Sequence, residues 1–149
     1  MTDSPPASVK RAWTQGELIV AALLGGASML LVELRFEHRE VLGETWRAWL
    51  PLVYSALLIV GGGAALLRFR RGGRRVLGVL FGLAVVIGAL GLWFHSDGHP
   101  LRALGQLGGA WWIPLGKDGG VKIGSQPPTL APAAFLGIGL IGLLACRKV

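Results

Sequence analysis

Residues 76–94 read VLGVLFGLAVVIGALGLWF, an apolar run without a charged side chain. Its 19 residues come close to the ~20 that an α-helix needs to cross the hydrocarbon core of a bilayer. Directly before it, RFRRGGRR at 68–75 contains five arginines: Arg68, Arg70, Arg71, Arg74 and Arg75. An apolar run beside a basic loop is typical of a membrane protein that crosses the bilayer several times.

Three further apolar runs lie on either side of this stretch, over about 18–34, 49–67 and 130–146. The first continues through Val32, which makes it long enough for an uncleaved span rather than a cleaved signal peptide. The last follows a proline-rich segment. We therefore predict an all-α integral membrane protein, a single domain over residues 1–149 built as a four-transmembrane-helix bundle.

The composition agrees with a membrane protein and argues against nucleic-acid binding. Hydrophobic residues make up 52% of the chain, charged residues only 15%, and the mean hydropathy is +0.57. The net charge is +7, but nucleic-acid-binding proteins carry such charge on a folded aqueous surface. Here the strongest basic cluster lies between two apolar runs. We expect the bilayer as partner, with anionic headgroups next to the arginines of loop 68–75.

Positive charge predicts the orientation of the four spans. Both termini and loop 68–75 fall on one side and carry nine of the 15 Lys and Arg residues. Loops 35–48 and 95–129 fall on the other side, where basic residues are sparser and mixed with acidic ones. Because cytoplasmic loops are enriched in Lys and Arg, we predict that both termini are cytoplasmic. The composition suits a multi-pass protein of a bacterial inner membrane.

Glycines inside the spans predict how the helices pack. The chain has 24 glycines, and small residues let helix backbones approach closely in lipid. Gly78 and Gly82 form a GxxxG pair, while Gly88 and Gly91 lie on another face of the same helix. We therefore predict that the third helix packs on two neighbours, as a central member of the bundle would.

Loop 95–129 is longer than ordinary connections, and loops of such length are usually functional or disordered. Its apolar and aromatic content argues against disorder. The segment WWIPLGKDGGVKIG at 111–124 is typical of a small hairpin with its turn at 117–120. We predict a short extracytoplasmic cap over the outer end of the bundle, or a docking surface.

Acidic residues cluster after the first span, at Glu33, Glu37, Glu40 and Glu44. On a continuous helix this spacing forms one stripe. A solvated face is the default interpretation, and pairing with basic residues comes second. Metal binding comes third. Carboxylate-bridged metal sites use a Glu-x-x-His motif, but the residue three positions before His38 is Arg35. Glu33 and Glu37 lie at the membrane edge, so proton or ion passage through Glu33 is a weaker alternative.

The three histidines all fall on the predicted outer side. His38 follows the first span, and His95 and His99 follow the third. Imidazoles ligate transition metals and haem iron, so a haem- or metal-binding electron-transfer subunit is the main alternative function. Histidines without a ligand are the simpler interpretation, because His99 precedes Pro100 and no span contains an internal histidine.

No pattern of residues predicts catalysis. The serines do not form a nucleophile-elbow motif, the glycine-rich segments lack the lysine–hydroxyl pair of a phosphate loop, and a CxxC motif is absent. We expect a non-enzymatic accessory or scaffold subunit of a membrane complex. It would dock a membrane-protein partner, or a second copy, through glycine-rich helix faces and outer loops.

Overall fold

The computed structural model describes residues 12–37, 39, 42–96, 98–101 and 130–147; for residues 37, 95 and 130 it describes the backbone alone. These ranges contain helices and turns and no strand, which confirms the all-helical class. The predicted hairpin at 111–124 lies outside the described residues. The helices are α1 (Gln15–Glu37), η1 (Trp46–Ala48), α2 (Trp49–Leu67), η2 (Phe69–Arg71), α3 (Gly73–His95) and α5 (Leu130–Ala145).

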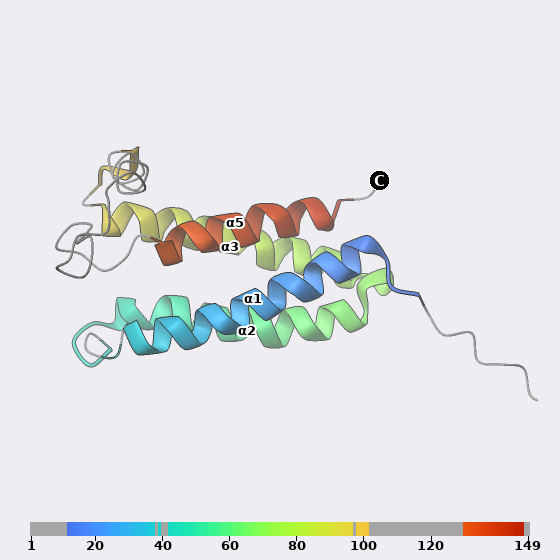
Figure 1. The fold of residues 1–149 in the computed structure, drawn as a ribbon, viewed down its shortest axis with the longest axis horizontal. Helices are drawn as coiled ribbons and strands as arrows, with labels where there is room; N and C mark the ends of the chain where they lie inside the picture. The colour runs from blue at the N-terminus through green and yellow to red at the C-terminus, as the bar shows by residue number, and fades with distance from the viewer. Residues whose placement is uncertain (1–11, 38, 40–41, 97, 102–129, 148–149) are drawn as a thin grey trace, which may run out of the picture.

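The four long helices form an elongated bundle of two layers, with α1 beside α2 and α3 beside α5 (Figure 1). Helix α3 also packs on α2, and α1 packs on α5, so each helix has two close neighbours in a ring. Helix α3 thus packs on two helices, α2 and α5. Buried Leu58, Leu77 and Phe81 belong to the core between the layers.

Local sequence explains where the helices begin and end. Pro51 lies in the first turn of α2, where its missing N–H leaves no helical bond unmade. Helix α2 ends at Leu67, and Gly72 adopts the left-handed conformation at φ 96° before α3 begins. At Gly73, a side chain would collide with the Ala65 carbonyl. These two glycines allow a turn of very few residues between antiparallel helices.

Helices α3 and α5 meet through glycines on both sides. A Cβ added to Gly88 would lie 2.8 Å from the carbonyl oxygen of Pro132, and one added to Gly139 would lie 2.7 Å from that of Phe81. Gly142 faces the Phe81 ring closely. Small residues therefore bring these two backbones together, as in membrane helix pairs generally.

Helix α2 is held to the other layer by larger side chains. The hydroxyl of buried Tyr54 donates a 2.6 Å hydrogen bond to the carbonyl oxygen of Leu80 in α3. Its ring meets Phe135 of α5 edge-on, with 5.8 Å between the centroids. Tyr54 thereby contacts both helices of the opposite layer, and its polar atom has a partner as burial requires.

The outward faces of the helices carry many large apolar side chains. Three helical segments are long and apolar enough to cross a membrane: Gln15–Phe36, Trp46–Leu67 and Gly73–Phe94, each with 22 residues. Only 33% of the most apolar window in each is buried inside the bundle. Large apolar side chains cover the rest, among them Met29, Val60, Val79 and Leu140. Helices that are apolar all round are typical of membrane spans.

Candidate functional site: a buried carboxylate at the basic end

The predicted histidine site falls largely outside the described residues. His38 and the side chain of His95 lie outside them, and His99 is exposed. Helices α1 and α3, near whose ends these histidines occur, are not among the closely packed pairs. Within the described ranges, no three His, Cys, Asp or Glu side chains are grouped so that they could hold a metal ion. Haem or metal binding by these histidines therefore stays a prediction.

The predicted stripe of glutamates does not continue as one helix. Helix α1 ends at Glu37, and Glu44 lies in a turn before η1. Glu40 lies outside the described residues. Glu33 is exposed on α1, whereas its neighbour Leu34 is buried. Glu33 therefore lies on the face of α1 that is turned away from the core of the bundle. Gly43, in the same turn as Glu44, disfavours a helix there. Proton or ion passage through Glu33 stays a prediction.

The four glycines predicted to pack α3 have two different surroundings. Gly88 and Gly91 lie against Pro132 of α5. Around Gly78 and Gly82, an added Cβ would meet nothing within 4 Å. The GxxxG pair therefore has open space beside it, while α5 supplies its own Gly139 and Gly142 to the closed interface.

Three segments that are distant in the sequence meet at one end of the bundle, which we call the basic end (residues 12–17, 68–75 and 145–147) (Figure 1). A Cβ added to Gly16 would lie 2.9 Å from the Ala145 carbonyl oxygen and 3.4 Å from the Phe69 ring. The start of α1, the α2–α3 loop and the end of α5 are thus in contact. Phe69, only 1% exposed, fills the space between them.

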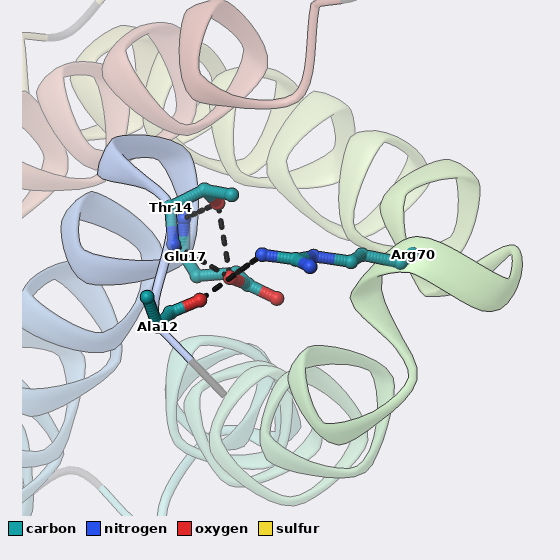
Figure 2. A network of polar contacts seen from close by, with 4 residues as sticks. All are labelled: Ala12, Thr14, Glu17 and Arg70. Atoms are coloured by element: carbon teal, nitrogen blue, oxygen red, sulfur yellow. Dashed lines mark hydrogen bonds and ion pairs between the residues drawn. The ribbon is translucent and has the colours of Figure 1, made fainter. Parts of the chain in front are cut away.

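The basic end contains a buried carboxylate, Glu17, whose side chain is 2% exposed (Figure 2). Its Oε2 accepts hydrogen bonds from the backbone N–H of Thr14 at 2.8 Å and from the Thr14 hydroxyl at 3.0 Å. The Glu17 N–H in turn donates to the Thr14 hydroxyl oxygen at 3.2 Å. This reciprocal arrangement is a capping box, and it places a negative charge at the positive end of the α1 dipole.

Arg70 links the capping box to the α2–α3 loop (Figure 2). Its Nη2 lies 3.6 Å from Glu17 Oε2 and donates a 3.1 Å hydrogen bond to the carbonyl oxygen of Ala12. The Arg70 side chain is 51% exposed, so water screens part of the attraction. One guanidinium therefore ties the loop to the residues that begin α1.

The other arginines of the loop are divided by their surroundings. Arg74 stacks on the Phe69 ring, with its Cζ 4.9 Å from the centroid. Arg68, Arg71 and Arg75 are exposed. Cys146 follows α5 at the same end, where burial raises the pKa of its thiol and the positive charge of Arg74 offsets only part of that rise.

The Glu17–Arg70 pair was not anticipated from the sequence. The spacing Thr14-x-x-Glu17 is itself a signal for a capping box at the start of a helix. No local signal predicts the partner, because Arg70 is far along the chain. Chemically, a carboxylate, a hydroxyl and a guanidinium fix two segments together, and the Thr14 hydroxyl and the Glu17 carboxylate are engaged in the capping box.

No protein-family model matches the chain, and no curated protein or solved structure is significantly similar to it.

Proposed function

We propose that this chain is a polytopic protein of a bacterial inner membrane whose four long helices all cross the bilayer. The observation that supports this is the apolar outer surface of the bundle. A 22-residue helix is about 33 Å long, which matches the ~30 Å hydrocarbon core. Helix α5, with 16 residues, is shorter, and local thinning of the bilayer would accommodate it.

Both termini and the α2–α3 loop would face the cytoplasm. The described part of the basic end contains six arginines and a single carboxylate, Glu17, which is buried. The opposite end, which we call the mixed-charge end (residues 33–37, 39, 42–49, 93–96 and 98–101), combines arginines with exposed Glu33 and Glu44. This asymmetry follows the positive-inside rule.

The role that we propose is non-enzymatic: an accessory or scaffold subunit that docks a helix of another membrane protein, or of a second copy, on α3. Gly78 and Gly82 lie one turn apart with free space beside them, and exposed Val79 and Leu83 flank them. A partner backbone could approach there as closely as α5 approaches Gly88. The outer loops would extend the contact.

The docking face is tested by substituting Gly78→Leu and Gly82→Leu together. The matched control is Gly25→Leu with Gly26→Leu on α1, where an added Cβ also meets nothing within 4 Å. We expect the α3 variant to lose its partner on native gels and in cross-linking of membranes, while the control keeps it. Both variants should unfold like the wild type, because neither site is packed within the chain.

Two results would contradict the proposed role. One is a wild-type chain that migrates alone in mild detergent and cross-links to nothing in native membranes. The other is an equal effect of the two leucine pairs on association, which would mean that the α3 glycines are not the docking face.

A further inference from the structure

The five arginines of the α2–α3 loop divide into two groups. Arg70 pairs with Glu17 and with the Ala12 carbonyl, and Arg74 stacks on Phe69. Arg68, Arg71 and Arg75 are exposed and form no ion pair or side-chain hydrogen bond with another described residue. Two arginines thus hold the loop in place, and three are exposed at the surface.

The described residues of the basic end offer these three arginines no free anion. Glu17 is the single acidic residue in the described ranges 12–17, 68–75 and 145–147, and its carboxylate is buried against Thr14 and Arg70. Closely spaced cations without a counter-charge repel one another. An external anion that bridges them would relieve this repulsion and gain charge-assisted hydrogen bonds.

The loop is fixed before any ligand arrives. Phe69 is buried, Gly72 makes the left-handed turn, and Gly73 packs against the end of α2. Arg70 anchors the loop to the start of α1. Binding at this loop therefore costs little ordering of the backbone.

The apolar residues beside the arginines indicate the class of anion. Leu67, next to Arg68, is 78% exposed, and Val76, next to Arg75, is 51% exposed. A ligand with a phosphate group joined to acyl chains would meet the guanidinium groups and these side chains together. A soluble phosphate or a nucleic acid would leave the apolar side chains uncovered.

We propose that Arg68, Arg71 and Arg75 form a binding site for the headgroup of an anionic phospholipid of the phosphatidylglycerol type. Arg70 does not bind the lipid; it positions the loop through Glu17. The site rests on the proposed membrane placement, since the phospholipid lies in the leaflet next to the basic end.

The test is a lipid titration of the full chain in detergent micelles, followed by native mass spectrometry. Phosphatidylglycerol is compared with phosphatidylcholine, which carries no net charge. We expect the wild type to bind phosphatidylglycerol more tightly than phosphatidylcholine. The Arg71→Gln variant should bind phosphatidylglycerol about fivefold more weakly than the wild type, the equivalent of ~1 kcal/mol per basic residue. The triple variant Arg68→Gln/Arg71→Gln/Arg75→Gln should bind the two lipids equally.

The matched control with the same change of charge is Arg35→Gln, an exposed arginine at the mixed-charge end. This variant should retain the preference for phosphatidylglycerol. Thermal unfolding of the triple variant should match the wild type, because its three side chains are exposed.

Several outcomes would overturn the lipid site. These are unchanged phosphatidylglycerol binding by the triple variant, equal weakening by Arg35→Gln and Arg71→Gln, or equally effective competition by inorganic phosphate. The test is separate from that of the docking role. A chain that forms its partner complex but binds both lipids equally would refute the lipid site alone. A chain that forms no complex but still prefers phosphatidylglycerol would refute the docking role alone.

Discussion

Each end of the bundle has an arginine stacked on a phenylalanine, but the two pairs differ in burial. At the basic end, Arg74 stacks on Phe69, with 4.9 Å between its Cζ and the ring centroid, and Phe69 is only 1% exposed. At the mixed-charge end, Arg47 stacks on Phe94 at 5.8 Å, and Phe94 is 57% exposed. The same kind of contact is part of the core at one end and lies on the surface at the other.

This difference indicates that side-chain contacts at the basic end are more deeply buried than those at the mixed-charge end. Phe69 is buried against Gly16 of α1 and Arg74 of α3, and Glu17 and Arg70 add a polar link in which the carboxylate is buried. At the mixed-charge end, the Arg47–Phe94 pair joins two distant segments at the surface, and the hydrogen bonds of Thr45 and Trp49 are local: Thr45 caps η1, and the Trp49 indole N–H donates a 2.9 Å hydrogen bond to the Leu42 carbonyl. Substitutions should therefore cost more stability at the basic end.

The largest difference is expected between Phe69→Ala and Phe94→Ala. Truncation of a buried phenylalanine leaves a cavity and should lower the free energy of unfolding by about 3 kcal/mol. The exposed Phe94 should cost less than about 1 kcal/mol, since little area and a surface cation–π contact are lost. Unfolding of micelle-solubilised protein by sodium dodecyl sulphate measures both, and equal losses would contradict the comparison.

Breaking the Glu17–Arg70 pair should have an asymmetric effect. Arg70→Gln leaves a buried carboxylate without this partner and should cost about 2 kcal/mol, less than a fully buried pair because Arg70 is half exposed. Glu17→Gln leaves a guanidinium that water can solvate and should cost about 1 kcal/mol. The double variant should be no less stable than Arg70→Gln, as a double-mutant cycle in the same unfolding assay would show. Additive losses would mean that the two side chains do not interact.

The capping box provides a smaller test at the same end. Thr14→Ala removes the hydroxyl that bonds to both the N–H and the carboxylate of Glu17. Loss of such a cap should lower the free energy of unfolding by about 1 kcal/mol. Thr14→Ser keeps the hydroxyl and should stay close to the wild type, so a similar loss in both variants would assign the effect to the methyl group instead.

The smallest change is expected at the mixed-charge end. Trp49→Phe removes the indole donor to the Leu42 carbonyl in an exposed setting. Water can replace this bond, so the loss should be about 0.5 kcal/mol. If Trp49→Phe lowered the free energy of unfolding as much as Arg70→Gln, the two ends would be stabilised equally by their side-chain contacts, which would contradict the comparison.

Much of the fold was predictable because the apolar runs are long and the loops between them are charged. The predicted span 49–67 coincides with α2, whereas α1 and α3 begin three residues before their predicted spans. Those starts depend on the Thr14 capping box and on Gly72, which hydropathy does not detect. The choice of α5 as the partner of Gly88 depends on the complementary shape around Gly139. The Glu17–Arg70 pair needs the folded chain to bring its members together.

The most direct test of the central claim, a membrane bundle with its basic end in the cytoplasm, is cysteine labelling from one side. In a Cys146→Ser background, Arg71→Cys and Glu44→Cys place single thiols at exposed positions of the basic and mixed-charge ends. Intact cells with a cytoplasmic membrane accessible to the reagent are treated with a membrane-impermeant maleimide. The account predicts labelling of Glu44→Cys at once and of Arg71→Cys only after permeabilisation. Labelling of both from the same side, or the reverse order, would contradict it.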